Sequence, residues 1–312
     1  MAQLANSFAT FNAVGNREQL ANAIYTISPE ETPFVSSIGK GKAGGVYEEW
    51  QTDALAAASN NKVEQGNEST VAAVTPTVRV GNRTQISEKV YAVTGTQEVV
   101  AKAGRTSELA YQDAKKMVEL KRDIEFACLQ NTTAIAAAAG VPGQSRGVLG
   151  WLDTNTDFGA TGADPNPITN TAPTDGTLRT FTEAHLKTVA QKCWESGGNP
   201  TMMFVPAALR ATVSGFTGSA TKFDKTEDKT LYATVEVYVG DFGRYSIVNS
   251  RHQRAREVFL IQPDMWSLLT LRPMQGQELA KTGDNKKRLV NTEYTLKCNN
   301  EAANGAIRDL QA

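Results

Sequence analysis

The first 45 residues of this 312-residue chain carry too few apolar side chains to build a hydrophobic core of their own. Two short helices are predicted here. One follows Asn16, with Gln19 three residues later, and the other follows Ser28, with Pro29 at the first helical position. Short isolated helices are marginal in water. Residues 1–45 are therefore predicted to be an arm that lies along another surface.

Residues 46–99 predict a long β-hairpin with a polar tip. Apolar residues, Tyr47 and Trp50 among them, lie on both sides of a polar stretch, and Gly81-Asn82 gives a turn signal. An isolated two-stranded hairpin is marginal in water, so this one needs a neighbour to cover it. Two strands of an ordinary sheet remain an equally open interpretation of the same residues.

The clearest helix is predicted over residues 107–130, where apolar residues recur at steps of three and four and form one stripe. Thr106 or Ser107 can cap it. Because only one face is apolar, the helix is expected to lie on a sheet with its other face in water. A second amphipathic helix is predicted over residues 182–196, ended by Gly197-Gly198.

The rest of the chain alternates loops, strands and a short helix. Residues 153–180 are rich in Asp, Asn, Thr, Gly and Pro and predict a long surface loop. A short helix is expected after Pro206. Strands are predicted at 201–205, around a turn within 235–248, at 258–261 and at 268–271. This irregular interleaving of helices and strands indicates the α+β class.

Charge and cysteine usage exclude several classes of protein. The 32 Lys and Arg residues nearly balance the 33 Asp and Glu residues, so no positive excess drives binding to nucleic acid or acidic lipid. The three cysteines are odd in number and far apart, which argues against a disulfide framework or a zinc ribbon. Neither a secretory signal nor an apolar run of about 20 residues is present, so we expect a soluble protein of the cytosol without a membrane segment.

Two motif matches suggest chemistry but lack its structural context. Residues 39–44 fit GxGxxG, yet a predicted helix precedes them and a strand follows, so a flexible turn is expected rather than a phosphate site. Residues 143–147 fit GxSxG around Ser145, but residues 148–151 predict a strand where a nucleophile elbow needs a helix. His185 lies in a predicted helix and His252 in a basic run. No catalytic, cofactor or metal site is predicted, and a serine hydrolase using Ser145 is the weakest alternative.

Four segments in a fixed order carry a family resemblance: residues 16–41, 146–152, 199–216 and 237–251. Together they resemble the major capsid proteins of tailed bacteriophages, which have the Hong Kong 97-type fold. The resemblance implies an N-terminal arm, an E-loop hairpin, a peripheral domain with a spine helix and an insertion loop, an axial domain, and strands that return to the peripheral domain. These correspond in order to residues 1–45, 46–99, 100–180, 181–250 and 251–312.

The resemblance implies a shell protein that assembles as hexamers and pentamers into the icosahedral head of a virion, formed in the host bacterial cytoplasm. The head would enclose double-stranded DNA without sequence-specific binding. The chain lacks the long, charged, coiled segment of the founding member, so a separate scaffolding protein is implied, together with a portal and, as a further candidate partner, a decoration protein. An encapsulin-like shell for cargo enzymes is the alternative.

Three aromatic residues are candidates for contacts between copies of the chain. Phe34 in the arm and Tyr47 and Trp50 in the hairpin are large apolar side chains in segments that need a covering surface. We predict that they anchor the arm and hairpin on neighbouring subunits. Packing inside their own chain is an equally open alternative.

Overall fold

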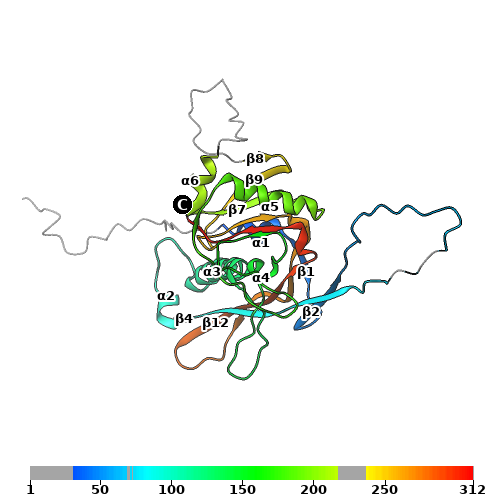
Figure 1. Cartoon of the computed structure of the whole chain (residues 1–312). Coiled ribbons are helices and arrows are strands. Elements are labelled where there is room, and N and C mark those ends of the chain that lie inside the picture. Colours follow the sequence, from blue (N-terminus) through cyan, green and yellow to red (C-terminus); the bar gives the residue numbers. More distant parts are fainter. Residues whose placement is uncertain (1–30, 69–70, 72, 217–236, 312) are drawn as a thin grey trace, which may run out of the picture.

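The computed structural model describes residues 31–68, 71, 73–216 and 237–311, and Figure 1 shows their arrangement. The helix predicted after Asn16 lies outside these residues, as do Ser28 and Val235. Two sheets organise the described part of the chain, and a two-stranded hairpin extends away from them.

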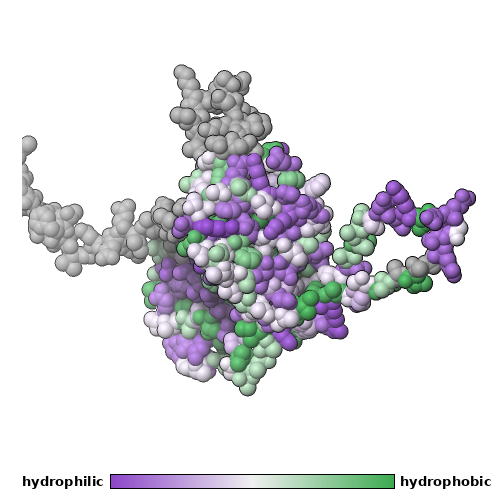
Figure 2. All heavy atoms as spheres, in the orientation of Figure 1, coloured by the Kyte–Doolittle hydropathy of each residue, from purple (hydrophilic) through white to green (hydrophobic). Residues whose placement is uncertain are grey.

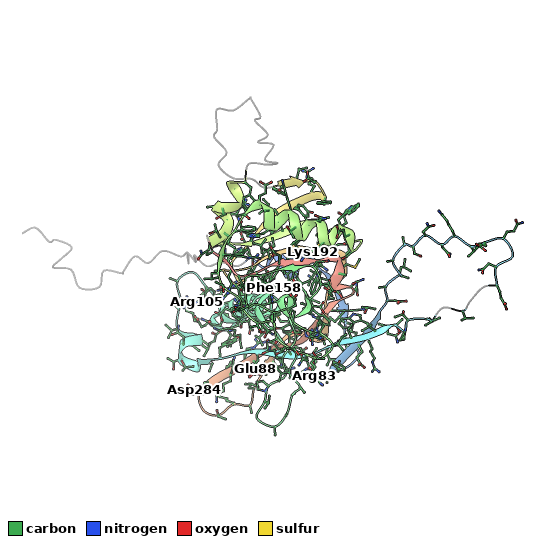
Figure 3. The ribbon with its side chains drawn as sticks, viewed as in Figure 1. Arg83, Glu88, Arg105, Phe158, Lys192 and Asp284 are labelled. Carbon is green, nitrogen blue, oxygen red and sulfur yellow. The ribbon has the colours of Figure 1, made fainter. Side chains whose placement is uncertain are left out.

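A four-stranded sheet contains the longest strands of the molecule. Its order is β1 (Gly39–Lys42), β11 (Trp266–Glu278), β12 (Asn285–Cys298) and β4 (Gln85–Thr94). β1 runs parallel to β11, and the other pairs are antiparallel. β11 and β12 form a long hairpin, and Asp284 marks its tip in Figure 3. A short helix, α2 (Gly95–Val99), follows β4.

The long helix α3 (Glu108–Gln130) packs against β4 and β12, as its single apolar stripe predicts. The Ser107 hydroxyl accepts a hydrogen bond from the Ala110 amide, which confirms the predicted cap. The stripe is buried at Leu120, Ile124, Ala127 and Cys128.

A six-stranded sheet forms the other half of the fold. Its order is β5 (Thr156–Asp157), β13 (Gly305–Ile307), β10 (Val258–Ile261), β7 (Met202–Pro206), β9 (Gly243–Ser250) and β8 (Val237–Gly240). The helices of this half are α5 (Glu183–Glu195) and α6 (Ala207–Ser214). The strand bounds confirm the predictions at 201–205 and 258–261 and the turn between β8 and β9.

The six-stranded sheet is buried on both faces. Along β7, Phe204 belongs to the hydrophobic core on the α3 side, whereas Met203 and Val205 belong to the core beneath α5 and α6. Successive residues of a strand point to opposite faces, so β7 contributes to both cores. Short elements complete the fold: α1 (Pro33–Ser37), β2 (Tyr47–Thr52), β3 (Val78–Arg83), α4 (Val148–Trp151), β6 (Arg179–Thr180), η2 (Pro263–Met265), η3 (Glu301–Ala303) and β14 (Leu310–Gln311).

Local signals were wrong at three places. Gly39–Lys42, predicted as a flexible turn, is strand β1, because pairing with β11 satisfies its backbone. Val148–Trp151, predicted as a strand, is the helical turn α4. Gly81-Asn82 lies inside β3 rather than at a turn. Helix α1 begins at Pro33, and the helix start predicted at Ser28 lies outside the described residues.

Candidate assembly surface

The β2–β3 hairpin projects from the body and ends in the loop 53–77 (Figure 1). Every described residue of this loop is exposed, and Figure 2 shows apolar residues along it. Leu55, Val71 and Val74 have exposed fractions of 99%, 100% and 92%. Burying a side chain of this kind contributes about 1.5–3 kcal/mol, so the loop offers a large gain to any surface that covers it.

Asn82 fastens the base of the hairpin to the body. Strand β4 pairs with β12 only as far as Tyr294, so the edge of β12 beyond that residue needs other partners. The Asn82 side-chain amide donates to the Leu296 carbonyl at 2.6 Å, and the Leu296 amide donates to the Ser145 hydroxyl at 3.2 Å. Asn82 is completely buried, and its carbonyl accepts from the Arg146 amide at 2.8 Å. The side chains of Asn82 and Ser145 therefore bind the backbone of β12 beyond the point where its pairing with β4 ends.

Ser145, the residue of the GxSxG motif, is part of this anchor. Its side chain is buried, and its hydroxyl contacts Asn82, Thr295 and the Leu296 amide. Neither described histidine is among its hydrogen-bond partners. An isolated bridge residue, not a strand, precedes it, so the chain does not form the strand–turn–helix of a nucleophile elbow.

Packing also explains why position 147, the second glycine of the GxSxG motif, is occupied by glycine. A Cβ at Gly147 would lie 2.5 Å from the Cys128 carbonyl oxygen, at the end of α3. Only glycine allows the backbone to approach the helix this closely. Close packing against α3 therefore accounts for a motif that otherwise indicates catalysis.

The two aromatic residues of β2 have different surroundings. Trp50 is half-buried against Trp151 of the same chain, with ring centroids 5.3 Å apart. Tyr47 is 45% exposed, and the Arg83 guanidinium lies over its ring at 4.9 Å. Figure 3 places Arg83 at the foot of the hairpin. Tyr47 thus presents apolar surface that its own chain leaves uncovered, whereas Trp50 helps to seat the hairpin.

A cavity of about 140 Å³ lies between part of the hairpin base and the body. Val78 and Val80 form one side, and Trp151, Asp153 and Glu301 form part of the other. Burial and the nearby Asp153 carboxyl raise the pKa of Glu301 to about 7. Trp50 and Val80 nevertheless pack against the core of the body, so the cavity lies beside the contacts that seat the hairpin.

Helix α1 is held on α3 by a buried carboxylate. The two oxygens of Glu125 accept hydrogen bonds from the Phe34 and Val35 amides, at 2.9 and 2.8 Å. These amides belong to the first turn of α1, where the backbone N–H groups have no acceptor within the helix. Burial raises the pKa of the Glu125 carboxyl. The sequence predicts a short helix after Ser28, but no local signal identifies a residue 91 positions away that binds the Phe34 amide.

Phe34 packs inside its own chain, not on the surface. Its side chain is fully buried, and its ring lies 5.7 Å from that of Phe204 and 5.9 Å from that of Trp266. The contact prediction for Phe34 is corrected accordingly, because its ring fills the space between α1 and the six-stranded sheet.

Charge pairs hold part of the predicted surface loop 153–180. Asp309 is buried, accepts from the Gly159 amide at 3.0 Å and pairs with Arg256 at 2.5 Å. Arg179 pairs with Asp157 at 2.9 Å. The loop is therefore fixed at its base, while parts of it remain exposed.

Within the described ranges, no group of three or more His, Cys, Asp or Glu side chains is arranged to hold a metal ion. His185 takes part in the cap of α5, where its Nδ1 lies 3.2 Å from the Thr182 hydroxyl. Among the helices described, none combines the length and apolar character that a membrane span requires.

Comparison with known proteins bears on both family and fold. The profile of the SU10 major capsid protein family matches residues 4–311. The major capsid protein of Escherichia phage Phieco32 is 26% identical over 337 aligned positions, which cover 96% of each chain.

Solved structures of shells have the same fold. The capsid structure of cyanophage P-SCSP1u superposes with a TM-score of 0.61 at 9% identity, covering 97% of this chain and 99% of the other. The encapsulin SrpI of Synechococcus elongatus PCC 7942 gives a TM-score of 0.59 at 10% identity, covering 95% and 92%. These similarities confirm the fold that the sequence resemblance implies.

Proposed function

The chain belongs to the SU10 major capsid protein family, and from this premise we propose that its copies assemble as hexamers and pentamers into an icosahedral phage head around double-stranded DNA. The protein is a phage major capsid protein and a component of the virion. A separate scaffolding protein, a portal and a decoration protein are its proposed further partners, and assembly takes place in the host bacterial cytoplasm. The role is structural, without a catalytic step.

The observation that carries this proposal is the uncovered hairpin. Its loop exposes Leu55, Val63, Val71 and Val74, with exposed fractions from 72% to 100%. A monomer gains nothing from ordering such a segment, because ordering costs conformational entropy and no apolar surface is buried in return. Contact with a neighbouring copy supplies that burial. We therefore assign the hairpin as the E-loop that lies over an adjacent subunit, with Tyr47 as an anchor at its base.

The position of the hairpin suits repeated contacts that differ slightly around a shell. Asn82 fixes the base, while the loop beyond it projects away from the body (Figure 1). Hexamers and pentamers need the same surface to meet neighbours at slightly different angles. A fixed base with a free loop provides that adaptability.

The encapsulin alternative has the same fold but a different content. A TM-score of 0.59 to an encapsulin and of 0.61 to a phage capsid cannot separate the two. The family match favours the phage head, since it covers nearly the whole chain. The contents of purified particles test this choice: nuclease-sensitive DNA supports the head, and an enclosed enzyme supports the cargo shell.

The loop itself can be tested by removing its apolar surface. The variant replaces four side chains by serine: Leu55, Val63, Val71 and Val74. We expect an unassembled chain with an unchanged unfolding midpoint, because these side chains are exposed, but a loss of closed shells. Sedimentation and negative-stain microscopy measure the shells under conditions in which the unaltered chain forms them.

A matched control replaces polar residues of the same loop, Asn60, Asn61 and Gln65, by serine. The control is expected to assemble normally, since these side chains are already hydrated. Full-sized shells from the apolar-to-serine variant would contradict the assigned contact.

A further inference from the structure

Two carboxyl groups of the body line the cavity beside the hairpin base, those of Asp153 and Glu301. The Asp153 amide lies 3.5 Å from Glu301 Oε2, and the Thr154 hydroxyl donates to both Glu301 oxygens, at 2.9 and 3.0 Å. The two carboxyl groups also share a hydrogen bond. The structure therefore holds two acids side by side at the wall of a small cavity.

Another part of the cavity wall belongs to the hairpin. Thr52, at the end of β2, and Val78 and Val80 of β3 line it, and none of the three can ionise. Trp151 also lines the cavity, and its ring packs against the Trp50 ring that seats the hairpin. A change of charge in the cavity therefore acts directly on the surfaces that hold the hairpin base.

No basic side chain forms an ion pair with either carboxyl group in the part of the chain that the structure describes. Arg146 approaches Asp153, but its guanidinium lies over the Trp151 ring at 4.6 Å and donates to Asn170 at 2.8 Å. Asp164, a further acid near Asp153, is paired with Arg308 at 3.5 Å. The other ionisable groups around the pair are thiols that burial keeps neutral by raising their pKa: Cys193 of α5 and Cys298 of β12.

The pair holds one proton at mildly acidic pH. Burial and the Asp153 carboxyl raise the pKa of Glu301 to about 7, while Arg146 favours ionisation of Asp153. A raised pKa stabilises the closed arrangement fully below the ordinary value, and this contribution is lost as pH rises through the raised value. For Glu301 the window runs from 4.5 to about 7.

We propose that the Asp153–Glu301 pair is a pH-dependent switch for the base of the E-loop hairpin. With one proton bound, the two carboxyl groups hydrogen-bond each other, and the hairpin base stays seated. Loss of the proton leaves two negative charges beside Val78 and Val80, and like charges next to an apolar wall are unfavourable. Water entry and movement of the hairpin base relieve this cost. The switch regulates the assembly surface already assigned, so its use in a shell rests on the proposed function.

Hydrogen–deuterium exchange of the full-length, unassembled chain between pH 5 and 8 tests the switch. Mass spectrometry measures the protection of backbone amides, corrected for the intrinsic pH dependence of amide exchange. If opening returns Glu301 to its ordinary pKa, protection in residues 47–52 and 78–81 is expected to fall by about 50-fold over this range and to level off above pH 7. Amides of α3 report global unfolding and are expected to remain more protected at every pH.

Two variants remove the switch, and a third is the matched control. Glu301→Gln keeps the shape of the side chain without its charge and is expected to make hairpin protection independent of pH. Asp153→Asn is expected to reduce the fall in protection, because burial still opposes ionisation of Glu301 but the neighbouring charge does not. Glu257→Gln removes another buried carboxyl whose pKa is raised to about 7, next to β10 rather than the hairpin, and is expected to keep the full response.

Four results would overturn the switch. They are hairpin protection that stays constant in the unaltered chain, a response that persists in Glu301→Gln, a response that disappears in Glu257→Gln, and a loss of protection confined to the loop around Pro167 and Ile168, which also lines the cavity. Because the unassembled chain is used, each of these results is distinct from a failure to form shells.

Discussion

Replacing Asn82 by alanine is expected to destabilise the unassembled chain by about 3–5 kcal/mol. The substitution leaves two buried backbone groups without partners, the Arg146 amide and the Leu296 carbonyl. An unsatisfied buried group costs about 1–3 kcal/mol, and the lost packing contacts of the Asn82 carboxamide add to this. Since a folded domain is stable by only about 5–15 kcal/mol, the loss is a large fraction of the total.

Urea unfolding of the full-length chain, followed by circular dichroism, measures this loss. Asn60→Ala is the matched control, because Asn60 is exposed in the loop and such changes stay within about 0.5 kcal/mol. A loss below about 1 kcal/mol for Asn82→Ala, or one equal to the control, would refute the role of Asn82 as the partner of the β12 edge.

Two further predictions concern the buried core. Burial raises the pKa of Glu257 to about 7. The folded state therefore favours the protonated carboxyl, and this contribution to stability is fully present below the ordinary pKa near 4.5 and is lost as pH rises through 7. Glu257→Gln is expected to remove about 3 kcal/mol of the change in unfolding free energy between pH 4.5 and 8, as measured by urea unfolding at each pH. Phe34→Ala is expected to cost about 3–5 kcal/mol, because it empties the space between Phe204 and Trp266; an unchanged unfolding midpoint would show that α1 is not docked there in solution.

Elements with local signals could be predicted closely from the sequence. Helix α3 was expected over 107–130 and spans Glu108–Gln130, because both its cap and its apolar stripe depend on nearby residues. Strand β12 was not predicted, although a period of two was present: Val290, Tyr294 and Leu296 alternate with mostly polar residues and are buried.

The anchor of the hairpin could not be predicted in the same way. Gly-Asn is a common turn signal, and nothing near Asn82 indicates that its amide contacts Leu296, 214 positions later. The burial of Phe34 is equally non-local, since an apolar residue in a short helix can pack on its own chain or on another. In both cases the tertiary contact, not the local pattern, decides the role.

The parallel pairing of β1 with β11 has a mechanical consequence. β1 lies at the edge of the four-stranded sheet and follows α1 directly, so tension applied along the N-terminal segment first meets the Glu125 contacts. Once the Glu125 contacts have broken, force along the strand axis acts on all the hydrogen bonds between β1 and β11 at once, in shear, rather than on one after another. Force applied through this segment is thereby shared across the sheet instead of peeling its edge.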